Sequence, residues 1–172
     1  MPADSQRLVA EPSAMALVSA RGQREGGELP PAVTFGGGAE GAAALYLRFP
    51  PVWRGKQRVE AAFVVLEPMP GTAASSEDVE VEVWRVRVPW KSEDLSWLGQ
   101  PERALPKSRG IARATPAAPL RIDVTELARY FAAHAQSDFG IALECGSGSG
   151  AGASYATGAS GGRGPRLELY LR

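Results

Sequence analysis

Hydrophobic and polar residues alternate with a period of two along much of the chain, which is the pattern of half-buried β-strands. The clearest strand runs over residues 79–88, and in its first half Val79, Val81 and Val83 alternate with Glu80 and Glu82. After Val83 the apolar phase moves to Trp84, and we interpret this shift as a β-bulge or a change of buried face. Other short apolar runs bounded by turn-forming or polar residues are also predicted strands: residues 8–10, 15–19, 32–35, 43–49, 58–66, 120–124, 141–144 and 166–171.

Three segments depart from this pattern. Residues 125–135 have helical spacing, with Leu127 and Phe131 on one face and Thr125 as the predicted cap. Residues 89–120 contain five prolines and are predicted to be mostly loop around one short strand, because proline cannot donate to a β-ladder. Residues 146–164 contain eight glycines and four serines and are predicted to form one flexible loop or a long hairpin connection.

These elements predict one domain over residues 1–172, an all-β, antiparallel jelly-roll sandwich of about 8–10 strands with one short helix. The composition agrees, because 20 Gly and 14 Pro leave little room for long helices and 44% hydrophobic residues suffice for a core. No apolar run has the length of a membrane span, and no secretory signal is visible before Arg24. We therefore expect a soluble protein, either cytoplasmic or exported through a signal outside this sequence.

The net charge and the numbers of cysteines and histidines exclude several classes of function. The 19 basic and 19 acidic residues cancel, which argues against a nucleic-acid binder or a polybasic membrane-surface protein. The single cysteine, Cys145, excludes an intramolecular disulfide and a thiolate metal cluster. The single histidine, His134, excludes a His-rich metal or haem site and any catalytic scheme that needs two imidazoles. No cofactor is predicted.

A series of short motifs follows in a fixed order along residues 45–172: Leu47-Arg48-Phe49, residues 63–66, residues 81–86, Pro89–Trp97 with Gln100-Pro101, Ile122–Leu127, Phe139–Leu143 and Gly164–Leu169. In this order they resemble the motifs of the DNRLRE domain family. The resemblance implies a jelly-roll sandwich akin to carbohydrate-binding modules, without a catalytic residue set. It also implies kinship with modules of secreted or surface proteins that often stand beside polysaccharide-degrading domains. The chain departs from the family at Leu98-Gly99, where relatives have an Asn-containing turn, and in the long run 146–164.

The four tryptophans have two possible roles, sugar stacking or packing. Trp53 follows two prolines and is flanked by basic residues, so we predict that it is exposed and contacts a ligand. Trp90 and Trp97 could form an aromatic platform, but they carry the family resemblance, which favours burial between loop and sheet. Trp84 lies on a predicted strand and is interpreted as a packing residue.

A basic stretch supplies the other candidate ligand contacts, and its members are Arg103, Lys107, Arg109, Arg113 and Arg121. No acidic residue interrupts it before Asp123. A concave face lined in this way would concentrate an acidic polymer such as a uronate polysaccharide, because arginine presents a bidentate fork to carboxylates. The alternative is a solvated loop whose charge is compensated by acids from elsewhere in the fold.

The remaining polar candidates are assigned to structure. Asp78, Glu80 and Glu82 could offer oxygens to calcium, but their alternate positions are explained more simply by a solvated strand face. Asp123 is assigned to the start of the helix. His134 is assigned to the helix C-terminus, where it can interact with the last carbonyls, and Cys145 is assigned to an inert buried position. The glycine run lacks phosphate-loop spacing, and no nucleophile elbow or distinctive carboxylate pair occurs.

Three functions remain open. The first is a non-catalytic binding module for an acidic or neutral glycan. The second is a structural or assembly subunit of a surface layer, coat, fibre or large complex, with a protein partner. The third is an enzyme such as a polysaccharide lyase, which the residue content supports least, so we expect a non-enzymatic protein.

Overall fold

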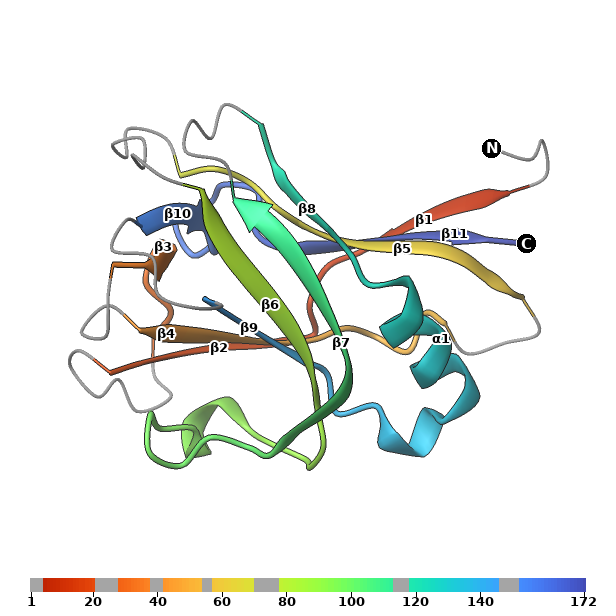
Figure 1. Ribbon diagram of the computed structural model, residues 1–172, viewed down its shortest axis with the longest axis horizontal. Coiled ribbons are helices and arrows are strands. Elements are labelled where there is room, and N and C mark those ends of the chain that lie inside the picture. Colours follow the sequence, from red (N-terminus) through yellow and green to blue (C-terminus); the bar gives the residue numbers. More distant parts are fainter. Residues whose placement is uncertain are drawn as a thin grey trace.

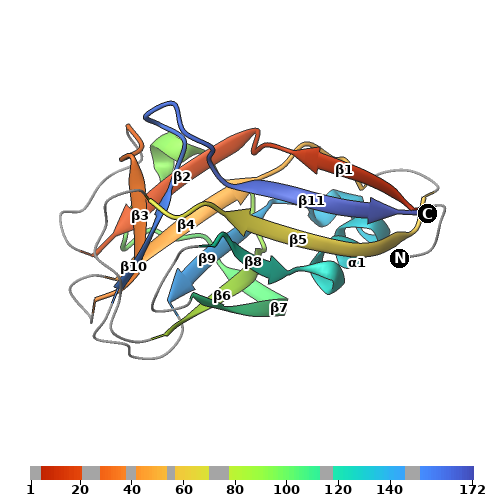
Figure 2. The same cartoon turned by 90° about the horizontal axis from the view of Figure 1, so that it is seen from above.

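Two antiparallel sheets face each other in the computed structural model of the protein, which describes residues 5–20, 28–37, 42–53, 57–69, 78–112, 118–145 and 152–172 (Figures 1 and 2). The four-stranded sheet has the order β1 (Gln6–Ala10), β11 (Arg166–Leu171), β5 (Val59–Leu66) and β8 (Leu120–Asp123). The five-stranded sheet has the order β2 (Ala14–Ser19), β4 (Ala43–Arg48), β9 (Ile141–Cys145), β6 (Val79–Val86) and β7 (Arg103–Ala112).

Smaller elements close the two ends of the sandwich. Strands β3 (Ala32–Gly36) and β10 (Gly152–Ala156) form a two-stranded sheet at one end, and helix α1 (Thr125–Ala133) lies at the other (Figure 1). Two short 3-10 turns, η2 (Ser92–Asp94) and η3 (Ala135–Ser137), lie in the connections. The all-β antiparallel sandwich with one short helix is confirmed, and no helix of the described residues has the length and apolar character of a membrane span.

The period-two pattern places the core between the sheets. On β6, Val79, Val81 and Val83 are fully buried, while the intervening glutamates point to the opposite face. The phase change after Val83 corresponds to the second predicted alternative, a change of buried face, because Val83 belongs to the core between the sheets whereas Val86 is buried on the opposite face. Strand β6 pairs with β9 without a shift over Val81–Arg85, and the register shift with β7 between Trp84 and Arg85 places the extra residues, Leu105 and Pro106, on β7.

A second hydrophobic cluster covers the outer face of the five-stranded sheet. Its buried members include Tyr46, Trp90, Leu95 and Ala142. Because Tyr46 and Ala142 alternate on their strands with residues of the main core, they point away from it, and the segment 87–102 covers them. Trp90 is 5% exposed and donates from Nε1 to the carbonyl oxygen of Phe139 at 2.7 Å, so it has the packing role favoured by the sequence.

Helix α1 begins differently from the prediction. Thr125 is its first helical residue rather than its cap, and the Thr125 hydroxyl accepts the amide of Ala62 at 3.0 Å. Asp123 instead accepts the backbone N–H of Thr125 at 2.9 Å, as expected for a residue at the helix start. At the other end His134 lies with Nδ1 3.0 Å from the carbonyl oxygen of Tyr130, which confirms its place beside the terminal carbonyls.

Two predicted loops contain strands. Residues 103–112 form the ten-residue strand β7 despite Pro106. Proline is tolerated there because β7 is the edge strand of its sheet, and a position without a neighbouring strand needs no N–H donor. Within the glycine-rich run, Gly152–Ala156 pairs with β3, so residues 146–164 are not one continuous loop. The alternation of β10 is weak in sequence because most of its residues are small. Residues 146–151 lie outside the described residues.

Candidate functional site

The exposure predicted for Trp53 is wrong. Its side chain is 4% exposed and stacks on Phe131 of α1, with ring centroids 5.3 Å apart. Its Nε1 donates to Asp138 Oδ2 at 2.9 Å. The apolar face of α1 provides a partner that the local sequence around Trp53 does not reveal, and Trp53 belongs to the packing at this end of the sandwich.

Arg103, Lys107 and Arg109 of the basic stretch lie on strand β7 and are largely neutralised, whereas Arg121 lies on β8. Lys107 Nζ lies 2.7 Å from Glu82 Oε1, and Arg109 lies 3.7 Å from Glu80 and 3.8 Å from Glu82. Arg103 is paired with Glu144 of β9. The face predicted to bind an acidic polymer therefore consists of ion pairs. This agrees with the alternative prediction, in which acids from elsewhere in the fold compensate the positive charges, although the residues lie on a strand rather than in a loop. Arg113 lies outside the described residues.

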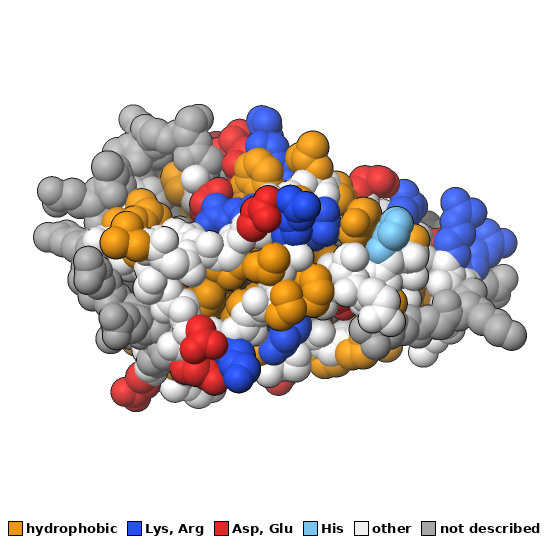
Figure 3. Space-filling model, turned by 90° about the horizontal axis from the view of Figure 1, so that it is seen from below, with side chains coloured by type: hydrophobic (Ala, Val, Ile, Leu, Met, Phe, Trp, Pro, Cys, Tyr) orange, Lys and Arg blue, Asp and Glu red, His pale blue; other side chains and the backbone are white. Residues whose placement is uncertain are grey.

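Figure 3 shows this side of the molecule, where hydrophobic side chains lie among charged groups of both signs. Lys107 also lies 4.3 Å from the centroid of the Trp84 ring, and Trp84 donates to Glu82. The hydrogen bond from Lys107 is the largest of the influences that lower the pKa of Glu82. Charges engaged in this way by their neighbours leave little field to attract an acidic polymer.

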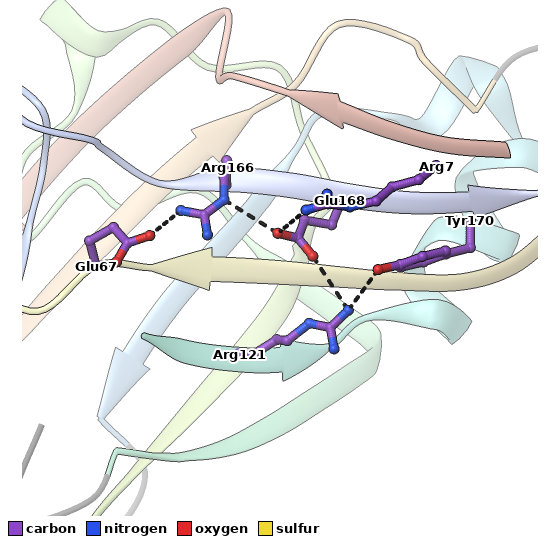
Figure 4. Close-up of polar contacts among 6 residues, drawn as sticks. All are labelled: Arg7, Glu67, Arg121, Arg166, Glu168 and Tyr170. Atoms are coloured by element: carbon purple, nitrogen blue, oxygen red, sulfur yellow. Dashed lines mark hydrogen bonds and ion pairs between the residues drawn. The ribbon is translucent and has the colours of Figure 1, made fainter. Parts of the chain in front are cut away.

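A different cluster of arginines lies on the outer face of the four-stranded sheet, around Glu168 of β11 (Figure 4). Glu168 Oε1 accepts from Arg7 at 3.0 Å and from Arg166 at 3.4 Å, and Oε2 lies 3.4 Å from Arg121. Glu67 provides a second carboxylate, which Arg166 contacts through Nη1. Three guanidinium groups therefore meet on one face with two carboxylates between them.

Strand register brings these residues together. Tyr170 pairs with Arg7 of β1, and Arg166 pairs with Val65 of β5, which in turn pairs with Arg121 of β8. Residues paired in this way project from the same face of a sheet. Arg121 therefore extends across β5 to reach β11.

Glu168 is held ionised although it is only 6% exposed. Burial alone would raise its pKa, but the hydrogen bond from Arg7 and the positive charges of Arg7 and Arg121 outweigh burial, so that the pKa of Glu168 lies below its usual range. Because Arg7 and Arg121 keep 55% and 44% of their side chains exposed, they retain N–H donors that face solvent.

This arrangement predicts an acid-sensitive fold. A carboxyl whose pKa is lowered in the folded state stabilises the protein above its unfolded pKa of about 4.3, and this contribution is lost as pH falls through the lower folded pKa. We expect the free energy of unfolding to decrease as the pH is lowered below about 4. In Glu168→Gln this decrease should be less steep, because up to about one proton fewer is taken up on unfolding. Urea unfolding between pH 2.5 and 7 measures both slopes, and identical slopes would contradict the role given to Glu168.

A groove of about 700 Å³ continues from this cluster toward the turn 157–165, and we call it the arginine groove. Figure 2 shows that turn beside the connection between β1 and β2. Its charged lining residues are Arg7, Arg163, Arg166 and Glu11. Its other lining residues are Val9, Pro12, Met15, Leu29, Thr157, Gly158, Ala159, Gly161, Gly162, Gly164 and Pro165.

Glycine and threonine shape the wall of the arginine groove formed by the turn 157–165. Gly158 and Gly161 have φ of +89° and +86°, which side-chain-bearing residues rarely adopt. A Cβ at Gly164 would lie 2.6 Å from the carbonyl oxygen of Thr157, so the turn closes only with glycine there. The Thr157 hydroxyl donates to the carbonyl oxygen of Pro30, which ties the turn to the segment before β3.

A second, shallower groove of about 530 Å³ lies on the other side of the molecule, and we call it the Trp90 groove. Its charged lining residues are Arg48, Lys91 and Asp94. Trp90 itself is buried beneath it, with the guanidinium of Arg48 5.4 Å from its ring centroid. This groove therefore offers fewer cations than the arginine groove.

The arginine groove can hold an anion through guanidinium N–H groups, with apolar side chains beside them. Sequence reasoning considered Arg121 but missed Arg7, Arg163 and Arg166, and the only local signal was the unexplained glycine run that ends at Gly164. No protein-family model matches the chain, and no curated protein matches it either.

Proposed function

We propose that the protein is a non-catalytic binding module and that the arginine groove takes an acidic polysaccharide, such as one built from uronic acids. The observation that carries the proposal is the lining of the groove, which holds three arginines and one acidic residue, Glu11. Arg7 and Arg166 also pair with Glu168 and Glu67, which do not line the groove, whereas exposed Arg163 has no ion pair within the described ranges. The resemblance to the DNRLRE family, whose fold is akin to carbohydrate-binding modules, supports the same class of function.

The lining favours an acidic ligand over a neutral one. Neutral sugars are commonly held by stacking on aromatic rings, and no aromatic side chain is among the described residues that line this groove. Arginine, in contrast, forms two parallel hydrogen bonds with a carboxylate. The apolar residues, such as Met15 and Leu29, provide surface for the C–H groups of sugar rings.

Arg163 is the best residue for a test, because its side chain is exposed and makes no ion pair within the described ranges. Its replacement should therefore affect binding more than folding. We expect Arg163→Glu to weaken binding to polygalacturonate or alginate by about tenfold or more, since an attractive contact becomes a repulsive one. Affinity electrophoresis and calorimetry in about 0.15 M salt with a calcium chelator measure this, at an ionic strength that screens long-range attraction.

Lys91→Glu is the matched control. It reverses one exposed positive charge beside the Trp90 groove, and we expect unchanged affinity for both polymers. Wild-type protein should show no retention by a neutral dextran. Failure of the wild type to bind either uronate polymer would refute the proposed function, and a loss in Lys91→Glu alone would place the ligand in the Trp90 groove instead.

A structural or assembly subunit is the competing proposal, and exposed apolar residues on edge strand β7 favour it. Leu105 is 67% exposed and Ile111 is 43% exposed. The same strand carries Pro106 and Lys107, however, and proline and lysine on an edge strand oppose pairing with another chain. Light scattering at high protein concentration discriminates the two proposals, because assembly requires growth beyond the monomer.

A further inference from the structure

We infer that the ligand extends beyond the arginine groove onto the face of the four-stranded sheet, where Arg121 and Tyr170 form a second contact point. The protein would then recognise an oligomer of acidic sugars rather than a single acid group. This inference rests on the proposed function and specifies the length of ligand that the same site requires.

The second contact point is a guanidinium fixed above aromatic rings. The Arg121 guanidinium carbon lies 3.7 Å from the centroid of the Phe63 ring, and Arg121 Nη2 lies 3.3 Å from the Tyr170 hydroxyl. The rings of Phe63 and Tyr170 meet edge to face, with centroids 6.2 Å apart. A guanidinium stacked on a ring keeps its donors in a fixed plane, so little conformational freedom is lost when it binds a carboxylate.

Glu168 connects this point to the groove. One of its oxygens faces Arg7 and Arg166, which line the groove, and the other faces Arg121, which does not. Figure 4 shows the three arginines around Glu168, with Tyr170 beyond it along β11. Arg163, Arg166 and Arg7 therefore line one groove, and Arg121 lies on the other side of Glu168 from Arg7 and Arg166.

Glu168 and the nearby acids do not saturate these cations. Arg121 contacts both Glu168 and Tyr170 through Nη2, and within the described part of the chain its Nε and Nη1 donors have no hydrogen-bond partner and can face a ligand. Asp123, two residues further along β8, accepts the backbone N–H of Thr125. A carboxylate-bearing chain that leaves the groove along β11 would next meet Arg121.

The experiment measures affinity for oligogalacturonates of increasing length in wild type and in Arg121→Ala. We expect wild-type affinity to rise with length until the chain reaches Arg121 and then to level off. Arg121→Ala should bind the shortest oligomers as the wild type does and should lose about tenfold for the longest, the loss expected when one hydrogen-bonded charge contact is removed. A merely structural effect of Arg121 would lower affinity equally at every length.

Two further variants complete the test. Arg121→Lys keeps the charge but loses the planar fork, and we expect it to restore only part of the length dependence. Arg87→Ala, which removes a comparably exposed arginine paired with Glu102, should match the wild type at all lengths. If Arg163→Glu weakens binding while Arg121→Ala binds oligomers of every length as tightly as the wild type does, the inference is overturned and the proposed function stands. If no oligomer binds the wild type, both are overturned.

Discussion

Replacing Gly140 with alanine is expected to destabilise the protein by about 2–5 kcal/mol, the sum of a left-handed backbone penalty and a steric one. Gly140 has φ of +88°, which disfavours any residue with a Cβ. An added Cβ would also lie 2.3 Å from the carbonyl oxygen of Leu47, a backbone atom held by the pairing of β4 with β9. Neither element can move aside, because both lie in the interior of the five-stranded sheet. Urea or thermal unfolding followed by circular dichroism measures the loss.

Two other glycines separate the causes. Gly161 has φ of +86° but its Cβ would meet no described atom within 4 Å, so Gly161→Ala should cost only the backbone penalty of about 1–2 kcal/mol. Gly162 has the same open surroundings without a positive φ, and Gly162→Ala should change stability by less than about 0.5 kcal/mol. If all three variants had equal stability, the steric cost predicted from the close approach of Gly140 to β4 would be contradicted.

Trp53→Ala is expected to cost about 3–5 kcal/mol of stability, the usual loss for removing a buried tryptophan. The variant leaves a cavity against Phe131 and removes the hydrogen bond to Asp138. Because Trp53 lies beside α1 and does not line the arginine groove, the loss should appear in unfolding experiments and not in the affinity of the folded protein. Calorimetric titration well below the unfolding temperature measures the affinity of the folded protein separately from the loss of stability.

Trp53→Phe is the companion variant. It keeps a ring against Phe131 and loses the hydrogen bond, which contributes about 0.5–1.5 kcal/mol, so it should fold with intermediate stability. Its affinity for uronate polymers should equal that of the wild type. A variant of wild-type stability that had lost this affinity would show that Trp53 contacts the ligand, as its sequence context suggests.

Two of the motifs on which the family resemblance rests contain residues that pack the five-stranded sheet. Gly140 lies in the segment Phe139–Leu143, and Trp90 in the segment Pro89–Trp97 is held by the carbonyl oxygen of Phe139. The hydrogen bond from Trp90 to Phe139 joins the segment 87–102 to the residues that precede β9, on the outer face of the five-stranded sheet. The residues of these motifs therefore pack the core and the outer face of the sheet, whereas the residues of the arginine groove lie mostly outside the motifs.

The sequence by itself determined the class of fold. Period-two alternation requires strands with one buried face, and the phase change after Val83 predicted the change of buried face at Val86. Both features depend on near neighbours in the chain. It failed for β7 and β10, where an edge position tolerates Pro106 and small residues weaken the alternation. Composition could not distinguish these two strands from loops, since the position of a strand within its sheet depends on residues that are distant in the chain.

Only the tertiary structure decided which charges are available to a ligand. The stretch from Arg103 to Arg109 looks uncompensated along the chain, yet register places Glu80, Glu82 and Glu144 beside it. Arg7 and Arg166 stand at opposite ends of the chain and meet at Glu168 because β1 and β11 pair. Local patterns determine strands because strand formation depends on adjacent residues, whereas a charged site depends on pairings between distant strands.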